Sequence, residues 1–121
     1  MKFSQLVYFV GIIFLAQTSM FAKTDRYRCM WREDPSTTMV IGWQQISGAN
    51  PMVYCDVVDY KMDALKYSIK KAPDRAVNSK GMNTCFVRLT GLKPNTNYYF
   101  IIKDSESTSR RFFFKTAPSS A

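Results

Sequence analysis

The chain has 121 residues, with 17 lysines and arginines against nine acidic residues and a formal net charge of +8. This length supports one domain, and the 15% of aromatic residues supply large side chains for a compact core. The sequence contains no histidine, which excludes histidine-dependent triads and argues against a zinc or di-iron hydrolytic centre. The positive charge permits attraction to anionic partners without identifying one.

The first 22 residues have the pattern of an export signal. Lys2 is the only charge before Lys23, an apolar run extends over 6–16, and Ala22 offers a small residue ahead of the charged stretch. The run is short for a membrane span, and an uncleaved anchor is the alternative. The sequence therefore predicts a signal peptide over 1–22, a domain over 23–118 and a linker remnant over 119–121. The predicted location is periplasmic, cell-surface or extracellular.

Seven short segments have the composition and alternation of β-strands, and turn-forming residues separate them. They cover residues 26–31, 37–44, 52–58, 65–69, 83–89, 97–104 and 110–116. In the first segment, alternation places Tyr27, Cys29 and Trp31 on one face, and Trp43 of the second segment is expected at the centre of the core. Seven strands with turn-rich connections predict an all-β sandwich of the immunoglobulin or fibronectin type III kind.

The middle of the chain allows a second interpretation. Leu65, Ile69 and Ala72 also recur with a period near four, which would suit a helix over 62–71. A strand over 65–69 is preferred because the flanking segments are all β. Residues 70–81 are predicted to form a polar loop.

The stretch R-L-T-G-L-K-P-N-T-N-Y-Y (88–99) is predicted to form a corner between two strands. Gly91 and Asn95 favour turns, and Tyr98 stands near the start of the later strand. In β-sandwiches, a tyrosine at this place can bond its hydroxyl to the upstream backbone while its ring fills the edge of the core. The alternative is an ordinary β-turn followed by an aromatic strand.

The three cysteines of an exported chain cannot all pair within it. Cys29 and Cys85 are predicted to lie two strand spacings apart, roughly 9.6 Å, beyond the reach of a disulfide, and Cys55 faces Cys85 across sheets about 10 Å apart. We therefore expect three buried thiols that act as small apolar residues, with one Cys55–Cys85 disulfide as the alternative. The absence of C-x-x-C spacing disfavours a zinc site.

Three segments carry a more specific resemblance: Y-R-C-M-W-R-E-D-P-S-T-T-M-V-I-G-W-Q-Q (27–45), G-M-N-T-C-F-V-R-L-T-G-L-K-P-N-T-N-Y-Y-F-I-I-K-D (81–104) and S-R-R-F-F-F-K-T-A-P (109–118). Together they resemble the N-terminal fibronectin type III-like domain of purple acid phosphatase-like metallophosphoesterases, over nearly all of 26–118. In that family the sandwich precedes a larger catalytic domain with a dinuclear metal centre. None of the family's catalytic motifs has a counterpart here.

The resemblance implies a non-catalytic accessory domain of an exported metallophosphoesterase, with no cofactor or metal in this chain. Its implied partner is a metallophosphoesterase catalytic domain, in cis or in trans. The alternative is a stand-alone extracellular adhesion or ligand-binding module that uses loops or strand edges.

Four residues are candidates for binding a partner. Phe113 is expected to point outward, because its neighbours on either side share the core face, and with Val40 it is predicted to form an apolar contact patch. The resemblance implies that this patch would touch the catalytic domain. Arg110 and Arg111 contribute to a basic surface that could attract phosphate-bearing molecules. The alternative for each is an ordinary solvated surface.

Two classes of partner are not predicted. Nucleic-acid binding would require a basic groove with interleaved exposed aromatics, and the sequence shows neither clearly. Membrane contact is expected only through the signal segment, if that segment stays uncleaved.

Overall fold

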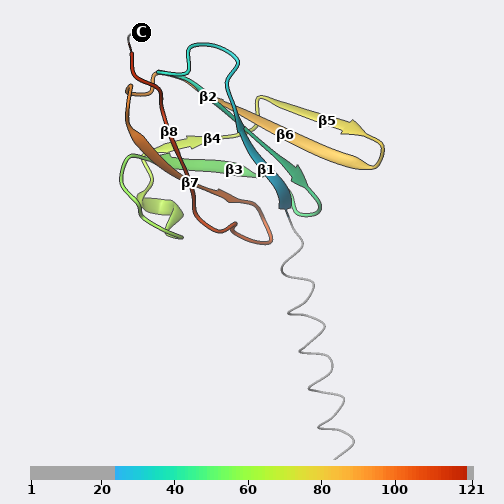
Figure 1. Cartoon of the computed structure of the whole chain (residues 1–121). Helices are drawn as coiled ribbons and strands as arrows, with labels where there is room; N and C mark the ends of the chain where they lie inside the picture. The colour runs from blue at the N-terminus through green and yellow to red at the C-terminus, as the bar shows by residue number, and fades with distance from the viewer. Residues whose placement is uncertain (1–23, 120–121) are drawn as a thin grey trace, which may run out of the picture.

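The computed structural model describes residues 24–119, so the predicted signal peptide lies outside the described residues. Eight strands form two four-stranded antiparallel sheets that pack face to face (Figure 1). The strands are β1 (Thr24–Met30), β2 (Met39–Gln45), β3 (Met52–Asp56), β4 (Ile69–Lys71), β5 (Arg75–Ser79), β6 (Met82–Leu89), β7 (Asn97–Lys103) and β8 (Phe112–Lys115). The predicted all-β sandwich is confirmed, with eight strands in place of the seven expected. No helix in this part of the chain is long and apolar enough to cross a membrane.

The first sheet has the strand order β1-β2-β6-β5, and the second sheet has the order β4-β3-β7-β8. Alternation along each strand sends every second side chain between the sheets. On β2, Ile41 and Trp43 pair in register with Val87 and Cys85 of β6, and all four are buried. The core consists of Met39, Ile41, Trp43, Val53, Cys55, Cys85, Val87, Leu89, Leu92, Tyr98, Phe100, Ile102 and Phe114. Trp43 is fully buried, as the sequence predicted.

The predicted corner is confirmed. The backbone N–H of Lys93 donates a 2.8 Å hydrogen bond to the hydroxyl oxygen of Tyr98, whose ring stacks on Phe114 in the core. Gly91 and Asn95 have φ values of 66° and 52°, in the left-handed region that the turn requires. The corner therefore has both the side-chain bond and the backbone geometry expected of a sandwich corner.

The middle of the chain differs from the prediction. A 3₁₀ turn, η1 (Ala64–Lys66), occupies the start of the expected strand, and β4 begins only at Ile69. Ala64 and Tyr67 are buried against Ile101 on the outer face of the second sheet, so residues 57–68 cross over that face instead of joining its ladder. We call residues 57–68 the excursion.

The expected polar loop over 70–81 contains the end of β4 and all of β5. Every residue of β5 is exposed or only partly buried, because β5 is an edge strand that leaves most of its surface in water. Such a strand needs no hydrophobic alternation, so the sequence carries little signal for it. In Figure 1, the hairpin of β5 and β6 extends past the second sheet.

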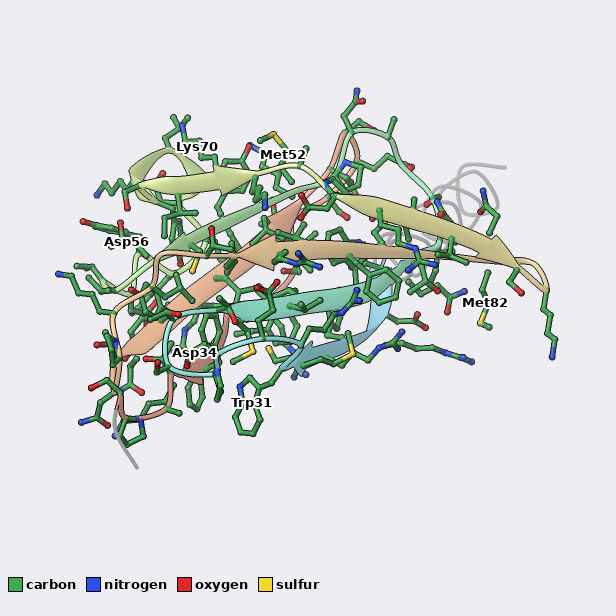
Figure 2. All side chains as sticks on the ribbon, turned by 90° about the horizontal axis from the view of Figure 1, so that it is seen from above. Trp31, Asp34, Met52, Asp56, Lys70 and Met82 are labelled. Carbon is green, nitrogen blue, oxygen red and sulfur yellow. The ribbon has the colours of Figure 1, made fainter. Side chains whose placement is uncertain are left out.

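Strand β1 also departs from the expected pattern. Its pairing with β2 shifts register between Asp25 and Arg28, and Arg26 has a φ of 54°, as in a β-bulge. Cys29 pairs with the core residue Ile41 but is exposed, because β1 is an edge strand and the core ends short of it. Trp31 is 64% exposed and extends away from the sheets (Figure 2). The expectation of three buried thiols is therefore wrong for Cys29.

Candidate partner-binding surfaces

The structure separates the residues that were predicted to bind a partner. Val40 belongs to β2 in the first sheet, and Phe113 belongs to β8 in the second sheet. Both point outward, and the outer faces of the two sheets lie on opposite sides of the sandwich. The predicted patch of Val40 with Phe113 therefore does not form, and each residue belongs to a surface of its own.

Val40 lies in a groove on the outer face of the first sheet, with a volume of about 460 Å³. Its lining is Met30, Arg32, Val40, Asp74, Arg75, Phe86 and Arg88, which we call the arginine groove. Met30, Val40 and Arg88 are paired across three neighbouring strands, so they share the outer face. Val40 is only 5% exposed although it is on the outer face of the sheet, because the neighbouring side chains cover it closely.

Glycine at position 42 shapes the floor of this groove. Gly42 pairs with Phe86 on one side and with Arg28 on the other. A Cβ at this position would lie 3.2 Å from two ring carbons of Phe86 and 3.3 Å from the methyl carbon of Met30. The missing side chain thus lets the Phe86 ring lie close over β2.

The groove carries more positive than negative charge. Arg88 pairs with Glu33 at 3.0 Å, and the Arg28 guanidinium lies 5.8 Å from the centre of the Phe86 ring. Within residues 24–119, Arg32 and Arg75 make no ion pair. The two uncompensated guanidinium groups are therefore available to an outside anion.

Asp74 is the acidic residue in the lining, and its charge is already compensated. It lies 3.1 Å from the ammonium of Lys71 and accepts a 2.6 Å hydrogen bond from the backbone N–H of Arg88. Partial burial would raise the pKa of Asp74, but these two donors outweigh it and hold the pKa below its ordinary value. Asp74 therefore anchors the crossing from β4 to β5 and offers little repulsion to an anion.

Phe113 lies on the outer face of the second sheet with Asn97, Tyr99 and Arg111, which together form the Phe113 surface. The Arg111 guanidinium lies 5.2 Å from the ring centre of Tyr99 and 5.9 Å from that of Phe113, and it pairs with Asp59 at 3.1 Å. Phe113 itself is 64% exposed. The aromatic ring is therefore held in place from one side while it faces solvent.

The adjacent residues Arg110 and Arg111 contact different aromatic rings. Arg111 joins the Phe113 surface, while Arg110 is exposed and lies 5.0 Å from the ring centre of Phe112. Arg110 borders a depression at the margin between β1 and β8, and Phe113 lines this depression too, together with Tyr27 and Cys29. The predicted basic surface thus divides, and Asp59 already compensates the Arg111 charge.

The excursion lies beside the Phe113 surface. The Tyr67 hydroxyl donates a 2.8 Å hydrogen bond to the carbonyl of Lys61, and burial raises the pKa of that hydroxyl. Four aliphatic side chains of the excursion stay exposed: Val57, Val58, Met62 and Leu65. The bond from Arg111 to Asp59 therefore ties this apolar segment to the start of β8.

The described residues include no group of three or more histidine, cysteine, aspartate or glutamate side chains that could hold a metal ion. All three cysteines are free thiols. Burial raises the pKa of Cys55 to about 12 and also raises the pKa of Cys85. These two buried thiols are poor nucleophiles, since the thiolate is the reactive form.

Sequence reasoning missed the groove arginines as a group. Arg32, Arg75 and Arg88 come from three separate segments, and only strand pairing brings them together. The available signal was the outward alternation of Phe86 and Arg88 on β6, opposite the core residues of the same strand.

The strand order defines the class of protein. One sheet of β1-β2-β6-β5 packed on a second of β4-β3-β7-β8 is the arrangement of immunoglobulin-like and fibronectin type III-like sandwiches. The chain belongs to the family of the purple acid phosphatase N-terminal domain, whose family model matches residues 24–116. The predicted family resemblance is thus confirmed.

Solved structures share this fold at low sequence identity. Astrotactin-2, a vertebrate-specific, perforin-like membrane protein involved in neuronal development, matches with a TM-score of 0.61 and 13% identity over 80% of this chain and 22% of that one. The sensor domain of the anti-sigma factor RsgI4 of Pseudobacteroides cellulosolvens matches with a TM-score of 0.50 and 16% identity, over 80% of this chain and 97% of that one. These likenesses concern the fold alone. No curated protein matches the sequence.

Proposed function

We propose that this chain is the accessory module of an exported metallophosphoesterase. It packs on a separate catalytic domain, in cis or in trans, and positions it, while phosphoester hydrolysis belongs to that partner. The match of residues 24–116 to the purple acid phosphatase N-terminal domain carries this proposal, because it spans all eight strands. Export rests on the signal pattern of residues 1–22. The family match does not favour a stand-alone adhesion module.

The Phe113 surface supports docking to the catalytic domain. An exposed aromatic ring offers a large apolar contact and loses little conformational entropy on binding, especially when a neighbour already restricts it. Arg111 restricts Phe113 from one side, and Asp59 fixes Arg111 in turn. The excursion covers part of the same outer face of the second sheet, and its four exposed aliphatic side chains add apolar surface there.

A binding experiment tests the docking role. The purified protein is titrated with a metallophosphoesterase catalytic domain encoded in the same genome, and heat is measured by isothermal calorimetry. Phe113→Ala should weaken binding roughly tenfold or more, as for a central aromatic contact. Trp31→Ala is the matched control, since Trp31 is equally exposed at 64% and lies in the other half of the sandwich. An unchanged affinity of the Phe113→Ala variant, or no binding by the parent protein, would overturn the docking role.

An activity measurement tests the non-catalytic role separately. The protein alone, supplied with iron, zinc or manganese, should leave p-nitrophenyl phosphate intact. Turnover that depends on the added metal, and that survives a second purification step, would overturn this assignment.

A further inference from the structure

We propose that the arginine groove binds an acidic, extended segment of a partner protein, which inserts a bulky apolar side chain between its carboxylates. The groove lies on the face of the sandwich opposite the Phe113 surface, so both can be occupied together. This inference is independent of the accessory role, because it rests on the groove's own floor and charges.

The floor of the groove is apolar. Val40 and Phe86 lie on the two central strands of the first sheet, and Met30 lies on the neighbouring edge strand. Gly42 has no side chain, so the Phe86 ring can lie close to β2. A volume of about 460 Å³ falls within the usual range of ligand pockets. An aliphatic or aromatic side chain entering from solvent would therefore lose water contact on most of its surface.

The walls of the groove supply the charge. Arg32 and Arg75 stand exposed on opposite sides of the floor, one after β1 and the other on the edge strand β5. A guanidinium group binds a carboxylate through two parallel hydrogen bonds, which fixes orientation as well as charge. Two carboxylates flanking one apolar side chain match this arrangement of two arginines flanking one apolar floor.

A nucleic acid fits the groove less well. Sequence-tolerant binding of single strands requires aromatic faces on which successive bases stack. Phe86 is the aromatic residue of the lining, and Arg28 and β2 already lie close to its ring. An acidic polypeptide needs no stacking face, so it is the occupant that these charges and this floor favour.

The test uses fluorescence anisotropy of the purified protein with a labelled peptide that repeats Glu-Ser-Leu-Ser, because residues two apart share one face of an extended chain while adjacent residues face opposite sides. Binding should weaken as sodium chloride rises from about 50 mM to about 200 mM, because the contact is partly electrostatic. Peptides with glutamine in place of glutamate, or alanine in place of leucine, should each bind roughly tenfold more weakly. Equal binding of the glutamine peptide, or no binding of the parent peptide, would overturn the proposal.

Paired variants locate the site. Arg32→Glu with Arg75→Glu should reduce affinity at least roughly tenfold, while Lys80→Glu with Lys93→Glu makes the same change of net charge at exposed positions outside the groove and should have little effect. Both pairs are on the surface, so thermal unfolding should show folded proteins. Equal losses in the two pairs would overturn the proposal, as would tighter binding of an oligothymidylate that depends on the same arginines.

Discussion

The side-chain amide of Gln45 donates a 2.6 Å hydrogen bond to the carboxylate of Asp104, and this bond joins the two sheets. The same amide nitrogen bonds the carbonyl of Ser47 at 2.6 Å, and the amide oxygen accepts a 2.8 Å bond from the indole N–H of Trp43. Gln45 and Asp104 are 6% and 8% exposed. One amide therefore satisfies a donor in the centre of the core and an acceptor at the end of β7.

Replacing this amide should destabilise the fold strongly. Gln45→Met keeps the size of the side chain but leaves the indole N–H of Trp43 without an acceptor and Oδ2 of Asp104 without its donor, while Oδ1 of Asp104 keeps the bonds from the backbone N–H groups of Glu106 and Ser107. Unsatisfied buried polar groups cost about 1–3 kcal/mol each, so the free energy of unfolding should fall by about 2–4 kcal/mol. Urea denaturation measures it, with Gln44→Met on the outer face as the control. Equal losses in the two variants would contradict the network's role.

Removing the hydroxyl of Tyr98 should lower the free energy of unfolding by less than the Gln45→Met substitution does. Tyr98→Phe keeps the ring between the core strands but leaves the backbone N–H of Lys93 without its acceptor. The free energy of unfolding should fall by about 1–2 kcal/mol, as for a single partly buried hydrogen bond. Tyr99→Phe on the outer face is the control for loss of a hydroxyl. An unchanged urea midpoint for Tyr98→Phe would show that the corner does not depend on this bond.

The corner and the centre of the core were predictable because local chemistry determines them. Tyr98 follows two turn formers at a fixed spacing, and Trp43 and Val87 lie on strands whose alternation is regular. A strand with one face in the core needs hydrophobic residues at every second position. A one-residue shift in strand register would turn all of these side chains toward solvent. The local sequence pattern is therefore enough to predict the structure of the corner and of the core strands.

Edges and surfaces were not predictable in the same way. Cys29 faces the inner side of the first sheet, as its alternation predicted, but it is not part of the core. Whether such a residue is buried depends on how far the opposite sheet extends over it, which the strand's own sequence does not show. Tyr67 is buried outside the main core, against Ile101, so its hydrophobicity suggested a strand where the chain makes a turn. The arginine groove depends on strand order, which short-range patterns do not contain.

Acid should destabilise the fold through three carboxylates. Hydrogen bonds from Ser36 lower the pKa of Asp34, and at Asp56 and Asp74 partial burial is outweighed by bonds from Ser68 and Arg88, so their pKa values are also lowered. Each pKa is lower in the folded chain than in the unfolded chain, where it is near 3.9. The unfolded state therefore binds more protons as pH falls, and the stabilisation present above about pH 5 is lost as pH drops through the folded values.

Urea denaturation between about pH 5 and about pH 3 measures this effect. Asp74→Asn should be less stable than the parent protein at neutral pH, since it loses the charge beside Lys71, and its stability should depend less on pH in the acid range. A parent protein with constant stability across that range would contradict the assignment, and so would an unchanged slope in the variant.

Thiol labelling should separate Cys29 from the two core cysteines. Cys29 is exposed, yet loss of solvent around its sulfur raises the pKa of the thiol to about 11. At pH 8 roughly one molecule in a thousand carries its thiolate, so alkylation by iodoacetamide should be slow and should accelerate about tenfold for each unit of pH below 11. Cys55 and Cys85 should react only on unfolding, because both are buried.

Mass spectrometry counts the labels. The native protein should take up one label and the protein in concentrated urea three, while Cys29→Ser should take up none when native and two when unfolded. Two native labels would show that the core opens on the labelling timescale. A missing pair of labels in urea without reductant would instead reveal a Cys55–Cys85 disulfide, which would require the two sheets to approach more closely at that point than their free thiols do here.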